Sequence, residues 1–345
     1  MAEPIEHIDF KLLLQRLSSG VHLGEDDAFA AVSAIMAGQA SEPVIAAFLT
    51  AIAIKGETED ELVGAARAMR HHLVPLRHDH TRVLDTCGTG GDLADTFNIS
   101  TTVAFVCAAA GVPVAKHGNR SASSRVGSAD VLEAAGVRLE LSPDKAADLF
   151  AELGYCFLFA PAWHQAMRHA APVRRQLGFR TIFNLLGPLS NPAGATHQLL
   201  GIHDLGRVGR MAAVLGRLGA TRVLVAHGAG GLDEIALSGS SHGVLNDRGT
   251  LQDVTIDPEA LGFELAPITA LRGGDAADNA KTMLAILGGE PGPKADIVAI
   301  NAGVALWAAE ATPDLPTAIT LSRNLLKTGA AAELFFRYRD RSLAS

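Results

Sequence analysis

The amino-acid sequence predicts an α/β protein with two domains: a small all-helical N-terminal domain and a larger domain with a mostly parallel central sheet. Three observations support this prediction. The first 75 residues show apolar residues at helical spacing only, and from Arg82 onward short apolar runs alternate with helices, as in parallel sheets covered by helices. The 345 residues, 48% of them hydrophobic, suffice for two cores. We expect the helical domain at 1–75 and the α/β domain at 76–345.

Four helices are predicted in the first domain, where apolar residues recur about every 3.6 positions. The polar runs SSG, AGQASE and KGETED separate them. Acidic residues at 25–27 open one helix, and Thr58 with Glu61 resembles a capping box at the start of another. The predicted helices are Asp9–Leu17, Gly24–Met36, Pro43–Ile54 and Glu59–His72.

Beyond Arg82, short buried strands and helices follow one another. The segment Val244–Ile256 is expected to form a hairpin, because the turn sequence NDRG lies within it. The predicted strands are Arg82–Thr86, Val112–Lys116, Tyr155–Phe159 and Val223–Ala226. The predicted helices are about Ser100–Ala110, Ser128–Ala135, Asp144–Leu153, Gly206–Leu218, Asn279–Leu287, Ala295–Ala309 and Leu315–Lys327.

Composition excludes several classes of protein. The net charge of −8 and the lack of a long basic run speak against nucleic-acid binding. Three widely spaced cysteines without a CxxC speak against a disulfide framework or zinc site, and favour a reducing compartment. We expect no signal peptide and no membrane span, since no uncharged apolar run reaches about 18 residues. A cytoplasmic protein is the expectation.

A glycine-rich loop follows the first predicted strand. Its run GTGGD (88–92) can adopt positive φ and let backbone N–H groups converge on phosphate oxygens at the next helix start. The run matches neither common nucleotide-binding motif, and alone it is equally consistent with a tight turn. Phosphate binding is favoured because the helix start carries more polar side chains than one N-cap requires: Thr96, Asn98, Ser100 and Thr101.

A second polar loop, KHGNRSASS (116–124), follows the strand Val112–Lys116. It supplies cations, a glycine and several hydroxyls. Open α/β sheets bind ligands at the carboxyl ends of their strands, so we expect this loop to lie beside the glycine loop. A solvated polar loop is the alternative interpretation. Two such loops after consecutive strands favour an anion site more than either does alone.

Asp233 and Glu234 form an acidic pair after the strand Val223–Ala226 and the turn HGAGG. On its own, the pair is consistent with a capped surface turn. Beside two phosphate-type loops it predicts a magnesium site, because Mg²⁺ is usually held by one or two carboxylates, phosphate oxygens and water. Asp92, at the end of the glycine loop, could join through a water or a backbone contact.

Residues 164–180 are the most basic segment of the chain. If the segment is one helix, His164 and Arg168 share a face at i,i+4. An arginine in it could pair bidentately with a small carboxylate or a phosphate. A solvated helix face with ordinary ion pairs is the alternative. The basic residues are His164, Arg168, Arg174, Arg175 and Arg180.

In combination, these segments resemble the anthranilate phosphoribosyltransferases, from the first helix to about residue 310. A lone GTGGD also fits the related pyrimidine nucleoside phosphorylases, whereas the HGNR loop and the long run at 180–192 are typical of the anthranilate enzymes. The matching runs are DTCGTGGD (85–92), TFNIST (96–101), KHGNR (116–120), GSADVLEA (127–134), RTIFNLLGPLSNP (180–192) and GLDEI (231–235).

The resemblance implies a nucleoside phosphorylase-like fold and a homodimer, in which the helical domain includes a segment from about 172–190 and hinges against the α/β domain. A cleft between the domains is the expected binding site. The implied activity is transfer of the 5-phosphoribosyl group from phosphoribosyl pyrophosphate to the amine of anthranilate, in tryptophan biosynthesis. The implied cofactor is Mg²⁺, two ions per subunit.

Site residues follow from the resemblance position by position. One Mg²⁺ would be held by Ser100 and Glu234, and the other by Asp233 and Glu234. Asn119 and Arg174 would bind anthranilate, with Gly88, His117, His164 and Pro188 lining its route or pocket. Contacts to phosphoribosyl pyrophosphate are implied for Gly88, Gly91, Asp92, Thr96, Asn98, Ser100, Thr101, Lys116, Ser124 and Ser128.

The sequence departs from the family pattern at Gly230, Val126 and Ala236. Many relatives have an acid at the first position, a small residue or serine at the second, and a serine at the third. None of the three is an expected ligand, so the departures concern loop packing and the rigidity of the metal site.

No side chain is expected to be indispensable as a general base, because an aniline-type nitrogen becomes acidic once it bonds to C1 of the ribose.

Two rival functions stay open. A nucleoside phosphorylase would use phosphate as nucleophile, and the acidic pair and the HGNR loop speak against it. A non-catalytic relative that binds nucleic acid would have degraded ligand loops and a basic surface, whereas this chain keeps the loops and is acidic.

Overall fold

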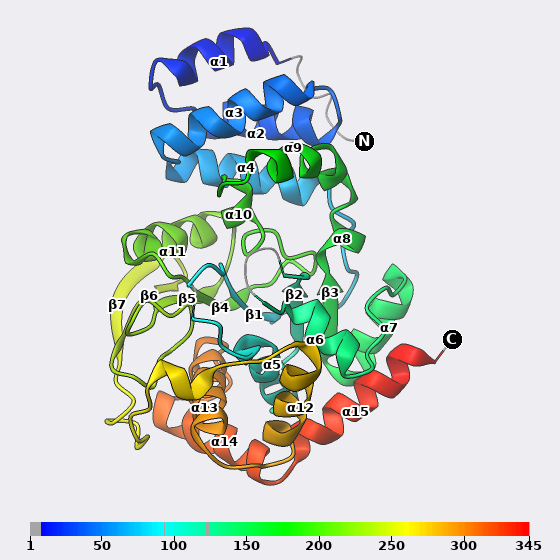
Figure 1. Ribbon diagram of the computed structural model, residues 1–345, viewed down its shortest axis with the longest axis vertical. Helices are drawn as coiled ribbons and strands as arrows, with labels where there is room; N and C mark the ends of the chain where they lie inside the picture. The colour runs from blue at the N-terminus through cyan, green and yellow to red at the C-terminus, as the bar shows by residue number, and fades with distance from the viewer. Residues whose placement is uncertain (1–7, 93, 122–124, 345) are drawn as a thin grey trace. The chain divides into compact units, whose positions relative to one another are not determined.

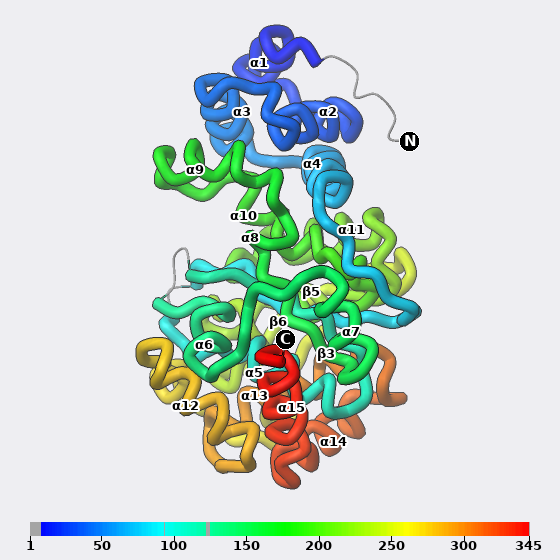
Figure 2. Tube along the Cα trace, turned by 90° about the vertical axis from the view of Figure 1, so that its right-hand side faces the viewer, coloured from blue at the N-terminus to red at the C-terminus, as the bar shows by residue number. Residues whose placement is uncertain are grey.

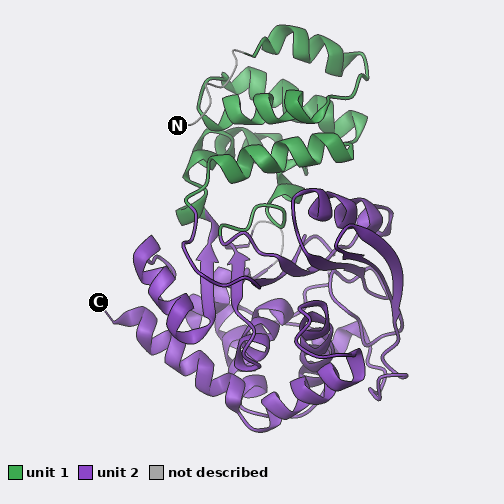
Figure 3. Ribbon diagram, turned by 180° about the vertical axis from the view of Figure 1, so that it is seen from behind, with its two compact units in different colours: residues 1–74, 161–192 green, residues 75–160, 193–345 purple. Residues whose placement is uncertain are grey.

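The computed structural model describes residues 8–92, 94–121 and 125–344. The chain divides into two compact units (Figure 3). The helical unit comprises Met1–Val74 and Pro161–Pro192, and the α/β unit comprises Pro75–Ala160 and Ala193–Ser345. No helix in these described ranges is long and apolar enough to cross a membrane.

The helical unit contains the four predicted helices, with ends that differ from the prediction by at most one residue. The capping box is confirmed: Glu61 N donates to Thr58 Oγ1 (3.3 Å), and Thr58 N donates to Glu61 Oε2 (2.9 Å). The apolar faces of α2 and α4 pack on each other. The elements are α1 (Phe10–Ser18), α2 (Glu25–Met36), α3 (Glu42–Lys55), α4 (Glu59–His71), a 3-10 helix (Gln165–His169), α9 (Ala171–Leu177) and α10 (Phe183–Leu186), with α8 (Ala160–Trp163) at the junction.

The basic segment 164–180 does not form one continuous helix. His164 caps a 3-10 helix, and α9 begins only at Ala171. Pro172 follows directly, and proline is favoured in the first turn of a helix but not inside one. His164 and Arg168 therefore do not share the face of an α-helix.

The α/β unit is built on a seven-stranded sheet in the order β3-β2-β1-β4-β5-β6-β7 (Figure 1). The pairings among β1 to β5 are parallel, and β6 and β7 form the predicted antiparallel hairpin. The mostly parallel sheet is therefore confirmed. The strands are β1 (Leu84–Gly88), β2 (Val114–Gly118), β3 (Tyr155–Phe159), β4 (His197–Gly201), β5 (Arg222–His227), β6 (Ser241–Asp247) and β7 (Thr250–Ile256).

Strand β4 lies in the middle of the sheet but was not predicted. Its first two residues, His197 and Gln198, are polar, so the apolar run is too short to stand out. Both are buried and hydrogen-bonded: His197 Nδ1 lies 2.9 Å from Thr196 Oγ1, and Gln198 Nε2 donates to Cys87 Sγ at 3.1 Å. Hydrogen bonding offsets the cost of burying such groups.

Helices cover both faces of the sheet. In Figure 1, α11 lies above the sheet, and α5 and α13 lie below it. The chain order reverses between β1 and β4, and open α/β sheets form ligand crevices at such points. The helices are α5 (Ile99–Ala109), α6 (Ser128–Ala134), α7 (Pro143–Leu153), α11 (Val208–Arg217), α12 (Ala276–Leu287), α13 (Pro293–Ala308), α14 (Leu315–Lys327) and α15 (Ala330–Leu343).

Helix α15 was also not predicted, because many charged residues interrupt its apolar spacing. It packs against α5 and α14 (Figure 2). Tyr338 is fully buried, and its hydroxyl accepts a hydrogen bond from Phe157 N at 3.0 Å. This aromatic side chain ties the C-terminal helix to strand β3.

Candidate active site

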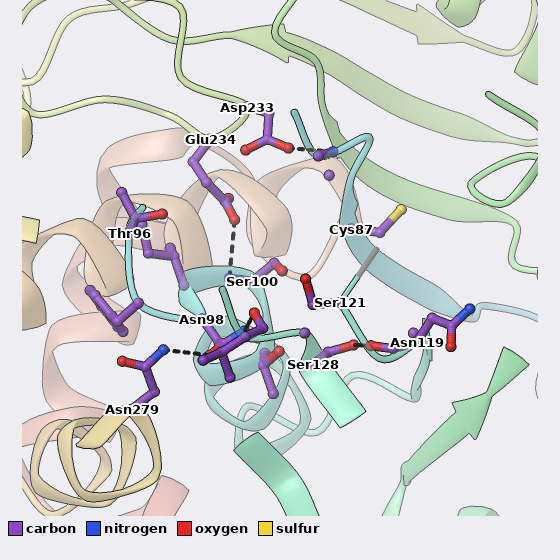
Figure 4. A pocket seen from close by; sticks show the side chains of 18 of the residues that line it. Cys87, Thr96, Asn98, Ser100, Asn119, Ser121, Ser128, Asp233, Glu234 and Asn279 are labelled. Atoms are coloured by element: carbon purple, nitrogen blue, oxygen red, sulfur yellow. Dashed lines mark hydrogen bonds between the residues drawn. The ribbon is translucent and has the colours of Figure 1, made fainter. Parts of the chain in front are cut away.

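A pocket of about 310 Å³ lies in the α/β unit, at the carboxyl ends of β1 and β2 (Figure 4). The glycine loop, the second polar loop and the acidic pair all line it. This agrees with the prediction that segments following parallel strands meet at one edge of the sheet. Ser124 lies outside the described residues. The residues with expected roles that line the pocket are Gly88, Gly91, Asp92, Thr96, Asn98, Ser100, Thr101, Lys116, His117, Asn119, Ser128, Asp233 and Glu234.

The glycine loop adopts the backbone conformation that its glycines permit. Gly90 has φ 66° and Gly91 has φ 88°, values that favour glycine over other residues. Gly90 N donates to Asp233 Oδ2 at 2.7 Å. The loop therefore lies directly against Asp233 of the acidic pair.

The acidic pair is buried in the pocket wall. Glu234 Oε1 accepts a hydrogen bond from Ser100 N at 3.1 Å, at the first turn of α5. Burial, with the negative charge of Asp92 added, raises the pKa of Asp233 to about 7. Burial and the neighbouring Asp233 raise the pKa of Glu234 to about 8. The buried carboxylates repel each other when they are ionised, so a nearby positive charge would favour their ionised forms.

These residues fit a divalent cation. Asp92 Oδ2 is buried and has no hydrogen-bond partner within the described ranges. In the same ranges, no group of three or more His, Cys, Asp or Glu residues is arranged to hold a metal ion. A Mg²⁺ ion would therefore need oxygen ligands from a substrate in addition to the acidic pair, which is the usual way that Mg²⁺ binds with phosphates.

Stability should depend on pH through this pair. The folded protein holds both acids with raised pKa values, so it binds more protons than the unfolded chain between about pH 4 and 8. The stabilisation that comes from this proton binding is present below the unfolded pKa values of the two acids. It is lost as the pH rises through 7 to 8. In EDTA, we expect the Tm of wild type to fall more steeply from pH 5 to 8 than that of an Asp233→Asn/Glu234→Gln variant. Parallel curves would contradict this.

Lys116 is buried on β2, below the start of α5. Its ammonium donates hydrogen bonds to the backbone oxygen of Thr86 and to Ser100 Oγ (3.3 Å). Burial lowers the pKa of Lys116, and the negative charge of Asp85 opposes that shift. The ammonium thus orients the Ser100 hydroxyl and supplies positive charge close to the pocket.

Asn98, the N-cap residue of α5, links two other walls of the pocket. Its Nδ2 donates to Val126 O at 3.0 Å, and its Oδ1 accepts from Asn279 Nδ2 at 3.1 Å (Figure 4). Asn279 also accepts from Gly274 N at 2.8 Å. Asn279 was predicted only as the start of a helix, whereas α12 begins at Ala276 and places this side chain in the pocket lining.

The second loop is held by its own backbone and by α6. Asn119 O accepts from Ser128 Oγ (3.3 Å) and Ala129 N (3.2 Å). Arg120 pairs with Glu133 at 2.7 Å and with Asp130 at 3.1 Å, on the exposed side of α6. The charge of Arg120 is therefore compensated within the loop and its helix.

Three residues expected near anthranilate belong to the helical unit: His164, Arg174 and Pro188. His164 is buried, which lowers its pKa to about 4 and keeps it neutral at pH 7. Arg174, on α9, lies over the Phe183 ring at 5.5 Å. It has no ion-pair partner among the residues that the structure describes, and burial lowers its pKa. Pro188 is half-buried.

Comparison with known proteins agrees with the fold. The model of the glycosyl transferase family a/b domain matches residues 80–332, and that of the family's helical bundle domain matches 11–73. The anthranilate phosphoribosyltransferase of Moorella thermoacetica is 51% identical over 93% of this chain and 95% of its own. That of Symbiobacterium thermophilum is 46% identical over 96% and 97%.

Solved structures give the same result. The anthranilate phosphoribosyltransferase from Thermus thermophilus is 45% identical and superposes with a TM-score of 0.90, over 96% of this chain and 99% of that one. The enzyme from Saccharomyces cerevisiae, in complex with PRPP and Mg, has the same fold at 22% identity, with a TM-score of 0.88. A helical bundle joined to an α/β domain with a phosphate-type glycine loop defines a glycosyl transferase of this class. Within the class, the chain belongs to the anthranilate phosphoribosyltransferase family.

Proposed function

We propose that the protein transfers the 5-phosphoribosyl group of phosphoribosyl pyrophosphate to the amine of anthranilate. The products are N-(5-phosphoribosyl)anthranilate and pyrophosphate, in a step of tryptophan biosynthesis. The observation that carries the proposal is one pocket that combines two phosphate-type loops with a buried acidic pair. Family membership supports the choice of substrates.

Phosphoribosyl pyrophosphate is proposed to bind along the glycine loop and the start of α5. Backbone N–H groups at a helix start suit phosphate oxygens. Thr101 Oγ1 is buried without a partner in the described part of the chain, so it has a free donor for this purpose. The proposed contacts are Gly88, Gly91, Asp92, Thr96, Asn98, Ser100, Thr101, Lys116, Ser124 and Ser128.

Two Mg²⁺ ions are proposed, one held by Ser100 and Glu234 and one by Asp233 and Glu234. Bound Mg²⁺ would neutralise the negative charge that develops on the pyrophosphate leaving group. The carboxylates of the pair carry raised pKa values, and binding a cation would release their protons.

In the reaction, the anthranilate nitrogen bonds to C1 of the ribose while the C1–O bond breaks, and pyrophosphate leaves with the electron pair. Backbone donors of the glycine loop and the Ser100 hydroxyl stabilise the charge on the departing oxygens. The nitrogen then loses a proton to solvent, to pyrophosphate or to the carboxylate of anthranilate. His164 is a weak base because its pKa is about 4, in keeping with a reaction that needs no side chain as a general base.

Anthranilate is proposed to bind through Asn119 and Arg174, with Gly88, His117, His164 and Pro188 lining its route or pocket. Arg174→Ala should raise the KM for anthranilate about 10- to 100-fold and leave the KM for phosphoribosyl pyrophosphate unchanged, because it removes a charge-assisted bond to a carboxylate. Arg175→Ala, an exposed neighbour on α9, is the matched control. Equal KM values for anthranilate in both variants would contradict the assignment.

The activity is tested by mixing the purified protein with anthranilate, phosphoribosyl pyrophosphate and Mg²⁺ and following anthranilate fluorescence. We expect a loss of fluorescence that requires all three components. Phosphorolysis of thymidine without such a loss would instead favour the nucleoside phosphorylase.

A homodimer in the cytoplasm is also proposed, from the resemblance to the family, and light scattering in solution checks the dimer.

A further inference from the structure

Asn301 is a fully buried polar residue in the middle of helix α13. Its side chain uses its full hydrogen-bonding capacity except one lone pair. Its Oδ1 accepts from Ile235 N (2.9 Å), and its Nδ2 donates to Ile235 O (2.9 Å) and to Ile297 O (2.8 Å). Asparagine is mostly exposed in folded proteins. A buried asparagine with two hydrogen bonds to one residue outside its helix therefore indicates a specific structural role.

Ile235 directly follows the acidic pair, and this part of the chain is irregular. Strand β5 ends at His227, and residues 233–235 belong to neither helix nor strand. In a regular strand, adjacent side chains point to opposite faces. Here the carboxylates of Asp233 and Glu234 both reach the pocket, one at Gly90 N and the other at Ser100 N (Figure 4).

An irregular segment has no neighbouring strand to hold its backbone. Asn301 takes the place of that strand, since its amide pairs with both backbone polar groups of Ile235. Ser241 Oγ accepts from Ala236 N at 2.9 Å and fixes the next residue. The backbone immediately after the acidic pair is therefore held by two buried side chains.

We propose that Asn301 is a positioning residue: by pairing with the backbone of Ile235, it holds Asp233 and Glu234 in the conformation that binds a divalent cation. The inference rests on the proposed metal role of the pair. Asn301 itself lies outside the pocket lining and contacts neither carboxylate directly. Its effect is transmitted through one residue of backbone.

The test compares Asn301→Ala and Asn301→Ser with Asn246→Ala. Asn246 is the matched control because it is also buried and bonded to backbone, donating to Ala212 O (2.8 Å) and accepting from Gly249 N (2.9 Å), away from the pocket. Asn301→Ser guards against misfolding, since a serine hydroxyl can bond the carbonyl four residues earlier in its helix, here Ile297 O, while the link to Ile235 is lost.

Binding of Mn²⁺ in the presence of inorganic pyrophosphate, followed by the electron paramagnetic resonance of free Mn²⁺, is the readout. We expect about tenfold weaker binding in both Asn301 variants, as for other residues that orient metal ligands. Asn246→Ala should bind Mn²⁺ like wild type, even if its Tm falls equally. Wild-type Mn²⁺ affinity in the Asn301 variants, or equal weakening in Asn246→Ala, would overturn the inference.

Asp233→Asn separates this inference from the proposed function. If Asp233→Asn weakens Mn²⁺ binding and the Asn301 variants do not, only the positioning role fails. If Asp233→Asn leaves Mn²⁺ binding unchanged, the metal assignment of the pair fails and the positioning role fails with it.

Discussion

Glu234→Gln is expected to lower kcat/KM by about 100-fold or more at saturating Mg²⁺, the scale on which loss of one preorganised electrostatic group slows an enzyme. Glu234 is proposed to contact both ions, and an amide keeps its size but loses its charge. Its Oε1 also accepts from Ser100 N, a bond that the amide oxygen can still accept. The loss would therefore arise from the missing charge at a nearly unchanged structure.

The same substitution should stabilise the protein when no divalent cation is present. Burial and Asp233 disfavour the ionised form of Glu234, so removing its charge should raise the Tm in EDTA at pH 8. Residues tuned for function often cost stability in this way. The exposed Glu259→Gln is the control and should change neither quantity. More than half of wild-type activity in Glu234→Gln would contradict the metal assignment.

Gly201→Ala is expected to reduce activity by about 100-fold, because a misplacement of catalytic groups by about 1 Å has effects of that size. Gly201 ends strand β4, and a Cβ there would lie 1.6 Å from Asp233 O. Two non-bonded atoms cannot be that close, so the backbone of the acidic pair must move away from Gly201. Gly201 has no positive φ, so alanine can adopt its backbone conformation, and the expected loss arises from the steric clash.

Gly209→Ala provides the control for that substitution. Gly209 lies in α11, and a Cβ there meets no atom within 4 Å. Alanine should raise stability by up to about 1 kcal/mol through helix propensity and leave activity unchanged. Steady-state rates measure the activity of both variants, and Tm values measure their stability. Wild-type activity in Gly201→Ala would mean that the position of Asp233 is not critical.

The fold was predictable where one periodicity dominated. The four helices of the N-terminal segment and strands β1, β2, β3 and β5 each follow a clear apolar pattern. Strand β4 was missed because buried His197 and Gln198 satisfy their polar groups through tertiary partners that the local sequence does not reveal. Helix α15 was missed because charged residues interrupt its apolar spacing, and its Phe335 meets Phe105 of α5 only in the folded chain.

The site was predictable in so far as its residues form contiguous motifs at strand ends. Parallel strands bring their carboxyl ends to one edge, so the two loops and the acidic pair were expected together. Asn279 and Asn301 were not identified, because each acts through a hydrogen bond to a residue distant in sequence. A lone asparagine in a helix gives no local signal of such a role.

The most direct test of the central claim is to identify the products. The protein is incubated with anthranilate, phosphoribosyl pyrophosphate and Mg²⁺. The organic product is identified by mass spectrometry, and the amount of released pyrophosphate is measured. We predict one N-(5-phosphoribosyl)anthranilate for each pyrophosphate, and neither product when EDTA removes Mg²⁺. A correctly folded protein that releases pyrophosphate without this adduct, or that forms neither product with Mg²⁺ present, would contradict the account.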